Sequence, residues 1–298
     1  MAEGSVVTIG KFDGVHLGHQ EIIGTAVTTA KNLKLSSVAL TFDRHPDALL
    51  NPEQCKLPLI GFEQKSSLIS ALGIDAMVTL EFDQALANMA PEEFVVNILV
   101  AKLKAKVVVV GVGFRFGSKG SGTVETLRDL GTNHGFEVIE LESVSIDGEV
   151  VSTTRIRDLL DRGEVSLANR LLGRRHSSIG VIEHGLKIGR TIGFPTANMS
   201  RESNGYLPLD GVYAGWLKVN SKTYPTAISI GINETFGAVP RVLEAFVIDQ
   251  ADLDLYDKIV EVEYVEFIRP ARKFDGVESL VAEIRLDIEK IRKILEIN

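Results

Sequence analysis

At residues 185–198 the chain reads GLKIGRTIGFPTAN, and this stretch opens a β-rich C-terminal third. Glycines recur in it every four residues, and glycine lets the backbone adopt positive φ and approach a ligand closely. Thr196 and Asn198 follow two residues apart, so in an extended segment both side chains point to one face. Their oxygen atoms are hard, neutral ligands suited to Mg²⁺ and phosphate groups. A glycine-rich β-turn with a polar edge fits the same spacing.

The composition is that of a globular protein with an acidic balance. Of 298 residues 45% are hydrophobic and 24% charged, and the formal net charge of −8 argues against nucleic acid as a partner. The single cysteine, Cys55, excludes an intrachain disulfide. The N-terminus lacks the pattern of a signal peptide, and no apolar run reaches membrane-spanning length. We therefore expect a cytoplasmic protein with no membrane partner; the oligomeric state is left open.

Strand and helix patterns alternate through the first half of the chain. Strands are expected at residues 5–10, 37–42, 76–80, 106–111 and 137–141. Helices are expected at residues 19–33, 63–72 and 124–133, and one more begins at Pro91. This alternation predicts an α/β domain with a doubly wound parallel sheet and sites at the carboxyl ends of its strands. Two short helices, at 154–161 and 165–172, would close it, so we place the domains at 1–174 and 175–298.

From Ser178 onward the apolar pattern has a period of two. Strands are expected at 211–219, 222–230, 241–248 and 258–267, the first two joined by a hairpin at Asn220-Ser221. Several short antiparallel strands in about 100 residues suggest a small β-barrel. A terminal helix with Asp275 as its N-cap is predicted by a stripe of apolar residues at helical spacing. The stripe consists of Val277, Leu280, Val281, Ile284, Ile288, Ile291 and Leu295.

The segment GRTIGFPTAN resembles the signature of riboflavin kinase, and the whole chain is similar to the bacterial bifunctional riboflavin kinase/FMN adenylyltransferase family. The resemblance implies a C-terminal barrel that phosphorylates riboflavin to FMN and a Rossmann-like nucleotidylyltransferase domain that adenylylates FMN to FAD. It implies riboflavin, FMN and ATP as partners, with Mg²⁺ held by Thr196 and Asn198. The implied ATP-binding residues of the barrel are Gly185, Gly189, Arg190, Gly193, Pro195, Thr196 and Asn198.

Glu244 is the candidate base for phosphoryl transfer. Strand alternation places it on one face with Val242, Phe246 and Ile248, and apolar neighbours raise the pKa of a carboxyl group. A glutamate on an edge strand at the mouth of the barrel fits the same pattern. The segment LEAF at 243–246 resembles the VEAH segment that carries the catalytic glutamate of the family, with Phe246 in place of its histidine.

A second candidate site follows the first strand. His16 and His19 flank Gly18 where a strand passes into a helix, and the free N–H groups and dipole of such a turn favour phosphate. Their imidazoles are candidates to stabilise the α-phosphate during transfer, although capping or packing fits an isolated HxGH. Residues 10–19 resemble the GxFDGVHxGH motif of the nucleotidylyltransferase superfamily. The ATP-binding residues that this resemblance implies are Gly10, Phe12, Asp13 and Gly18.

Two further segments are expected to converge on this site. Residues 152–157 resemble the STRIR motif, which implies Ser152 and Thr153 at ATP and Arg155 on its phosphates, while Arg157 fits a solvated helix face. Residues 41–46 resemble the TFDxHP segment of the family. Together with an FRF loop and one arginine before the terminal helix, the implied flavin-binding residues are Asp43, His45, Pro46, Phe114, Arg115, Phe116 and Arg272.

One position departs from the family pattern. Gly113 stands where the GxDFRFG or GxNFRFG loop carries Asp or Asn, so a polar side chain expected at the adenylyl-transfer site is missing. Two alternatives follow: a riboflavin kinase with an impaired adenylyltransferase domain, and a non-catalytic flavin-binding regulator. The presence of Glu244, Thr196 and Asn198 argues against the regulator.

Overall fold

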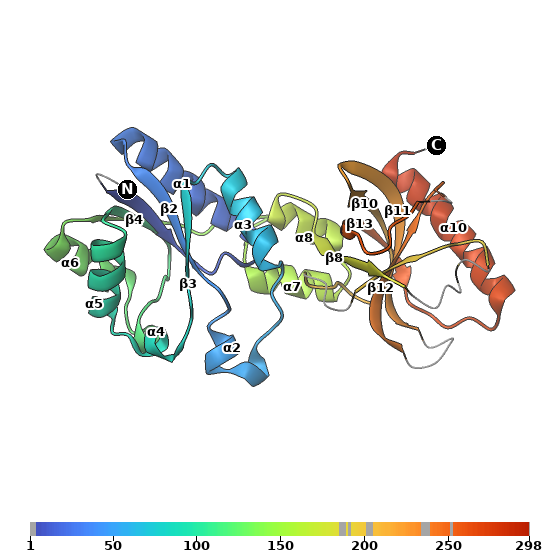
Figure 1. Cartoon of the computed structure of the whole chain (residues 1–298), viewed down its shortest axis with the longest axis horizontal. Coiled ribbons are helices and arrows are strands. Elements are labelled where there is room, and N and C mark those ends of the chain that lie inside the picture. The colour runs from blue at the N-terminus through green and yellow to red at the C-terminus, as the bar shows by residue number, and fades with distance from the viewer. Residues whose placement is uncertain are drawn as a thin grey trace. The chain divides into compact units, whose positions relative to one another are not determined.

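The computed structural model describes residues 4–184, 189, 192–200, 205–233, 239–250 and 253–297 (Figure 1). By contacts the chain divides into two compact units. The first unit comprises Met1–Pro58 and Phe62–Ser152, and the second comprises Leu59–Gly61 and Thr153–Asn298.

The helices α7 (Thr153–Asp161) and α8 (Val165–Leu172) group with the second unit, whereas the sequence placed them in the N-terminal domain. The backbone N–H of Leu209 donates to Leu160 O at 2.8 Å, and Asn169 Nδ2 donates to Tyr264 O at 2.9 Å. These bonds tie both helices to the barrel. The predicted domain boundary between residues 174 and 175 stays a prediction.

The first unit is built on a parallel five-stranded sheet in the order β3-β2-β1-β4-β5, as the strand–helix alternation predicts. Its strands are β1 (Ser5–Ile9), β2 (Ser36–Phe42), β3 (Ala76–Leu80), β4 (Ala105–Gly111) and β5 (Glu137–Leu141). Val7 of the central strand lies opposite Val38 and Val108. The runs of β-branched residues in β1 and β4 fit strands that are covered on both faces.

Helices cover the two faces of this sheet (Figure 1). On one face Val6, Val107 and Val109 pack against Ala26 and Ala30 of helix α1. The other face packs against residues of α5, of the π-helix η3 and of α6. The helical elements of the unit are η1 (Asp13–Val15), α1 (Leu17–Leu33), α2 (Asp47–Leu50), η2 (Pro52–Gln54), α3 (Phe62–Ala71), α4 (Gln84–Asn88), α5 (Pro91–Phe94), η3 (Val95–Lys102), η4 (Ser118–Gly120) and α6 (Val124–His134). A short hairpin of β6 (Ser145–Ile146) and β7 (Glu149–Val150) follows β5.

The second unit contains a closed antiparallel barrel in the order β10-β11-β12-β9-β8-β13, which confirms the predicted barrel. Its strands are β8 (Ser177–Glu183), β9 (Ala197–Met199), β10 (Gly211–Val219), β11 (Lys222–Asn233), β12 (Val239–Val247) and β13 (Ile259–Pro270). Asn220 and Ser221 join β10 to β11 with φ of 49° and 62°. Positive φ at both central residues of a two-residue loop is typical of a type I′ hairpin turn.

The terminal helix α10 (Val277–Leu295) packs on the barrel (Figure 1). Ile291 and Leu295 of the predicted stripe are buried in one cluster with Ala214 and Ile248. The prediction of Asp275 as N-cap is wrong: the helix begins at Val277, and Gly276 occupies the N-cap without a side-chain hydrogen bond.

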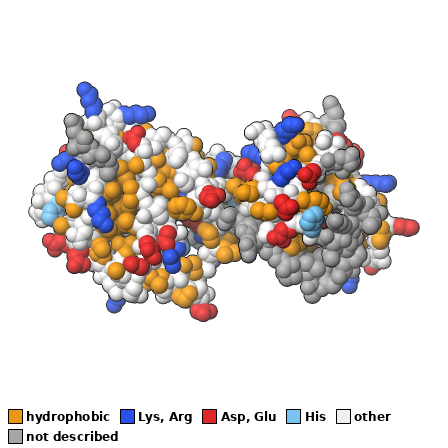
Figure 2. All heavy atoms as spheres, in the orientation of Figure 1, with side chains coloured by type: hydrophobic (Ala, Val, Ile, Leu, Met, Phe, Trp, Pro, Cys, Tyr) orange, Lys and Arg blue, Asp and Glu red, His pale blue; other side chains and the backbone are white. Residues whose placement is uncertain are grey.

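Two features of the described residues concern membranes and the surface charge of one face. No helix among the described residues is both long and apolar enough to cross a bilayer. On the face shown in Figure 2, acidic and basic side chains of the described residues are interspersed over each unit. A clustered basic surface, which phosphate-backbone binding requires, is not visible on that face.

A buried polar cluster joins α8 to the barrel. His176 is only 1% exposed, its backbone N–H donates to Asn169 Oδ1 at 2.6 Å, and its Nε2 lies 2.6 Å from Tyr206 O. The imidazole stacks on the ring of Tyr264 with 5.6 Å between centroids. Burial lowers the pKa of His176 from 6.5 to about 4, so the ring is neutral in the folded protein at neutral pH.

Because the pKa of His176 is lowered, we expect the stability of the second unit to depend on pH. Because its folded pKa lies below the unfolded value, the unfolded chain takes up the proton first as the pH falls. The contribution of His176 to the free energy of unfolding is therefore complete above pH 6.5 and is lost progressively toward pH 4. We expect the free energy of unfolding to fall by about 3 kcal/mol over that range from this group. Denaturant titrations followed by the fluorescence of Trp216, the single tryptophan, measure it.

His176→Phe is the matched variant, because it keeps a ring on Tyr264 and removes the titrating group. Its stability is expected to vary less between pH 6.5 and pH 4 than that of the wild type, whatever its absolute stability. An equally steep dependence in the variant would assign the effect to other groups.

Candidate active sites

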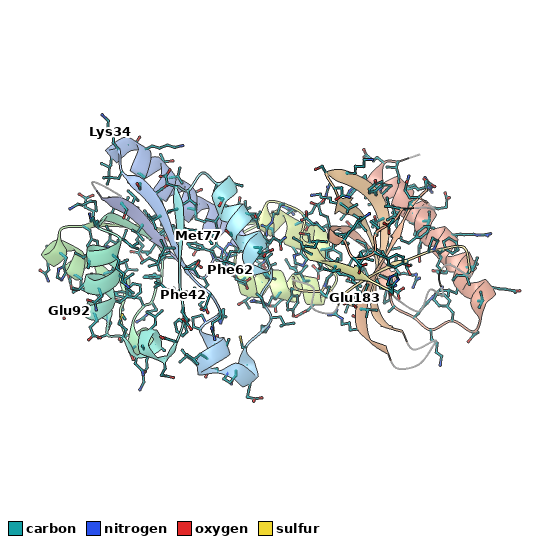
Figure 3. All side chains as sticks on the ribbon, in the orientation of Figure 1. Lys34, Phe42, Phe62, Met77, Glu92 and Glu183 are labelled. Carbon is teal, nitrogen blue, oxygen red and sulfur yellow. The ribbon has the colours of Figure 1, made fainter. Side chains whose placement is uncertain are left out.

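The barrel brings together two residues that the sequence places far apart. Glu244 of β12 is the direct cross-strand partner of Asn198 of β9. Directly opposed residues of an antiparallel pair share a face, with Cβ atoms about 4.5–5.5 Å apart. Glu183, labelled in Figure 3, is the partner of Asn198 on β8. One amide therefore lies in a row between two carboxylates.

Sequence reasoning missed Glu183, because the first strand predicted for the barrel begins at residue 211. The alternation in SSIGVIE at 177–183 was the available signal for β8. The pairing with Asn198 also depends on the register of β8 against β9, which no local pattern reveals.

The environment of Glu244 suits a proton acceptor. Its side chain is half-buried, and burial raises its pKa above the usual value. A carboxylate with a raised pKa holds a proton more strongly and accepts one from a hydroxyl group more readily. The expected alternation is also present, because Phe246 and Ile248 lie with the apolar cluster under α10.

The loop before β9 folds back on itself through Gly189. Phe194 N donates to Gly189 O at 2.8 Å, and a Cβ at residue 189 would lie 2.3 Å from Phe194 O and 3.4 Å from Thr196 Oγ1. The close approach that glycine permits is made here to the protein's own loop. Gly193 has φ of +87°, which also favours glycine. Gly185 and Arg190 lie outside the described residues.

Thr196 immediately precedes β9 and lines a small cavity. The cavity has a volume of about 80 Å³, and its walls include Pro195, Thr196, Ala197 and Ala245. Ala197 and Ala245 are cross-strand partners and alternate with Asn198 and Glu244 along their strands. Metal binding by Thr196 and Asn198 stays a prediction.

An aromatic contact fixes the same loop on the barrel. The rings of Phe194 and Phe246 meet edge to face, with centroids 5.4 Å apart and an angle of 72°. Phe246 stands where the family pattern has histidine, and here it packs against the loop that carries Pro195 and Thr196. Its neighbour on the same face, Glu244, is retained.

Arg272 is held by neighbours on the terminal helix and the preceding loop. Its Nη2 lies 2.6 Å from Glu283 Oε2, and its guanidinium lies 4.9 Å from the ring centroid of Phe274. The side chain is about half exposed. The predicted flavin contact of Arg272 stays a prediction.

In the first unit, the loop between β1 and α1 is built around Phe12. This residue has φ of +50° and is 1% exposed, and its ring meets His19 edge to face at 5.4 Å. A Cβ at Gly10 would lie 2.8 Å from the Phe12 ring, so the ring requires glycine there. Asp13 follows in the short helix η1. ATP binding by Gly10, Phe12 and Asp13 stays a prediction.

His16 and His19 form a stacked pair at the beginning of α1. Their ring centroids are 3.7 Å apart at an angle of 16°, and the backbone N–H of His19 donates to His16 Nδ1 at 3.4 Å. A neutral His16 ring that accepts at Nδ1 carries its proton on Nε2 and can donate from there. A Cβ at Gly18 would lie 3.2 Å from the His16 ring, so glycine gives the pair its room.

His19 is electrically neutral near pH 7. Burial first, and the charge of His16 second, hold the pKa of His19 well below its usual value. Its Nδ1 is buried without a hydrogen-bond partner among the described residues. A neutral imidazole carries one N–H group, from which it donates a hydrogen bond.

The segment after β2 meets the loop after β1, and its predicted convergence on the histidine pair stays a prediction. Lys11 Nζ donates to His45 Nε2 at 3.0 Å. Asp43 accepts from Phe82 N at 2.8 Å and pairs with Arg44 at 2.8 Å. Burial raises the pKa of Asp43, but these bonds outweigh it and leave the pKa below its usual value. Asp43 therefore holds the backbone beside β3, and Pro46 precedes α2; flavin binding by Asp43, His45 and Pro46 stays a prediction.

The STRIR-like segment spans the division between the units. Ser152 ends the first unit, and Thr153 and Arg155 lie in the first turn of α7 in the second. Their predicted convergence on the histidine pair stays a prediction. The solvated position expected for Arg157 is wrong: it is 7% exposed and lies 5.9 Å from the Tyr206 ring centroid, because α7 packs on the barrel side.

The FRF loop after β4 divides its residues between core and surface. Phe116 is 7% exposed and packs against Phe94 and Phe114, whose ring centroids are each 5.7 Å away. Arg115 is exposed. Phe116 thus belongs to the core of the first unit, and flavin binding by the three loop residues stays a prediction.

Gly113 lies in a turn that accepts a polar side chain. It has φ of +74°, and a Cβ there would meet no atom within 4 Å. Asn and Asp are the residues besides glycine that most readily adopt this conformation. We expect Gly113→Asn to keep the melting temperature, and Gly113→Val to lower stability by about 1–2 kcal/mol because a β-branched residue is strained there. Thermal unfolding of both variants tests this; a large loss in Gly113→Asn would contradict it.

Comparisons with known proteins cover nearly the whole chain. Residues 1–155 match the family model of FAD synthetase, and residues 172–295 match that of riboflavin kinase. A Listeria monocytogenes protein named bifunctional riboflavin kinase/FMN adenylyltransferase is 37% identical, with 96% of this chain and 91% of that protein covered. A protein of the same name from Buchnera aphidicola is 34% identical over 99% of this chain and 94% of its own length.

A solved structure agrees with the fold. A Streptococcus pneumoniae protein described as a macrolide-efflux protein has a TM-score of 0.88 and 32% identity, covering 98% of this chain and 95% of its own. The similarity supports the fold of both units.

Proposed function

Because the chain belongs to the bifunctional riboflavin kinase/FMN adenylyltransferase family, we propose that its two units catalyse consecutive steps of flavin cofactor synthesis. The second unit phosphorylates riboflavin to FMN with ATP. The first unit transfers AMP from ATP to FMN, giving FAD and pyrophosphate. The pairing of Glu244 with Asn198 on adjacent strands of the barrel is the observation that carries the kinase half. A cytoplasmic location belongs to this proposal, because both steps consume ATP.

In the kinase step, Glu244 takes the proton of the ribityl hydroxyl group. The hydroxyl oxygen then forms its bond to the γ-phosphorus of ATP, and ADP leaves. The raised pKa of Glu244 supports this role. Partial burial of the side chain is the cause of this raised pKa.

The donors beside Glu244 suit Mg²⁺. Asn198 supplies an amide oxygen, Glu183 a carboxylate in the same row, and Thr196 a hydroxyl just before the strand. Hard oxygen ligands of this kind, with the phosphates themselves, are what Mg²⁺ prefers. When bound, the ion neutralises charge on the ATP phosphates.

In the adenylyl step, a phosphate oxygen of FMN attacks the α-phosphorus of ATP, and pyrophosphate leaves. FMN is already an anion, so this nucleophile needs no base. The protein instead stabilises the charge that develops on the α-phosphate. Imidazole N–H groups of His16 and His19 at the beginning of α1 supply donors there, together with the helix dipole.

Chromatographic separation of flavins tests both halves. The purified protein is incubated with ATP, Mg²⁺ and either riboflavin or FMN, with a chelated sample as control. We expect FMN and then FAD from riboflavin, and FAD from FMN. FMN without FAD would support the kinase-only alternative, which the glycine at position 113 motivates. No conversion of either flavin would overturn the enzyme assignment.

A further inference from the structure

We propose that Lys65 is a positioning residue for adenylyl transfer, joining α3 to the loops that follow β1 and β2 and offsetting the carboxylates of Asp13 and Asp43. The inference rests on the proposed adenylyltransferase function of the first unit. Lys65 lies in α3, outside every motif that the sequence singled out.

The ammonium group of Lys65 has two neighbours at the carboxyl end of β2 and one in α3. Its Nζ donates to Thr41 Oγ1 at 3.3 Å and to Phe42 O at 3.1 Å. The same atom lies 5.3 Å from the ring centroid of Phe62, a distance typical of a cation–π contact. Figure 3 labels Phe42 at the end of β2 and Phe62 at the beginning of α3. One side chain thus ties these two elements together.

Thr41 extends the connection to the loop before the histidine pair. Its hydroxyl group accepts from Lys65 and donates to Lys11 O at 3.3 Å. Lys11 in turn bonds His45 at 3.0 Å through its own side chain. The hydrogen bonds therefore run from α3 through β2 to the loop after β1. Ligands of open α/β sheets bind at this edge, outside the carboxyl ends of the strands.

The charge of Lys65 is also placed where anionic substrates must enter. Its side chain is half-buried, and burial lowers its pKa, while Asp13 and Asp43 act in the opposite direction. Asp13 belongs to the loop after β1, and Asp43 to the segment after β2. Without the ammonium group, one positive charge beside these two carboxylates would be lost, and the local field would repel approaching ATP and FMN more strongly. In a chain of net charge −8, this local compensation matters.

The test compares substitutions at Lys65 in the full chain. Lys65→Met keeps the length of the side chain and removes its charge, so we expect the KM for FMN and ATP in FAD formation to rise about tenfold at low salt. Because mobile ions screen charges, the difference from wild type should narrow as salt is added. Lys65→Arg should restore most of the wild-type KM, and Lys65→Gln should behave like Lys65→Met.

Two controls separate this effect from damage to the fold. Lys102→Met removes an exposed lysine at the end of η3 and should leave the KM values for FMN and ATP unchanged. Riboflavin phosphorylation in each preparation reports on the second unit, and circular dichroism, compared with that of the wild type, reports on the folding of the whole chain. If Lys65→Met fails to fold while Lys65→Gln folds, the KM values of Lys65→Gln are compared with those of the wild type instead.

Specific outcomes overturn the proposal. An unchanged KM in the neutral variants would remove Lys65 from the site. A raised KM that neither responds to salt nor recovers in Lys65→Arg would reduce its role to packing. A wild-type protein that makes no FAD would overturn the adenylyltransferase assignment itself, and this inference with it.

Discussion

Glu244→Gln is expected to abolish FMN formation from riboflavin, with a fall of about 10²- to 10⁴-fold, the usual contribution of a positioned base. Glutamine has nearly the same shape and keeps the place opposite Asn198 and Ser229, but its amide cannot take the hydroxyl proton. FAD formation from added FMN should continue at the wild-type rate, because that step belongs to the first unit. Initial rates with riboflavin and with FMN measure the two effects separately.

The pH dependence of FMN formation by the wild type gives a second test of Glu244 as the base. Burial raises the pKa of Glu244, so the fraction of free base falls at a higher pH than for an exposed glutamate. FMN formation should therefore decline on acidification before FAD formation does. Glu266→Gln, on strand β13 of the same barrel, serves as control and should change neither rate. Full kinase activity in Glu244→Gln would remove the assigned base, and loss of both activities would argue against two separate sites.

His19→Ala is expected to give the reverse pattern, with FAD formation lowered by about 10²- to 10³-fold and FMN formation unchanged. The neutral ring supplies a hydrogen-bond donor in a fixed orientation for the charge on the α-phosphate. A water molecule in its place would not be held in that orientation. Conversion of FMN and of riboflavin by one preparation measures both rates.

His19 is a cleaner test than His16. The His16 side chain also caps α1, so His16→Ala is expected to cost about 1 kcal/mol of stability in addition to its effect on the reaction. His134→Ala in the last turn of α6 removes an exposed histidine of the same unit and should have no effect. Unchanged FAD formation in His19→Ala would leave the stacked pair with a structural role only.

Local patterns in the sequence predicted most elements of the fold. The β-branched run at 106–111 became a central strand, and the apolar stripe that ends at Leu295 became the terminal helix. Asn220-Ser221 formed the predicted hairpin, because residues that tolerate positive φ signal a turn by themselves. Strand–helix alternation in one half and period-two alternation in the other were enough to predict a parallel sheet and a barrel.

Local errors have local causes. Asp275 has a suitable side chain for an N-cap, yet α10 begins at Val277 after Gly276. Arg157 has a charged side chain of the kind usually found at the surface, but it is buried beside Tyr206, since α7 packs with the barrel. Burial depends on the partner element, which helical periodicity within α7 does not identify.

The sequence by itself determined the element types, the two fold classes and the positions of the motifs, because backbone preference and apolar period act over a few neighbouring residues. Only the tertiary structure decided which side chains meet. The row of Glu183, Asn198 and Glu244 depends on the registers of three strands, and the contact of Lys65 with Thr41 depends on where α3 packs. Register and packing are settled by burial of whole faces at once, so no single segment contains them.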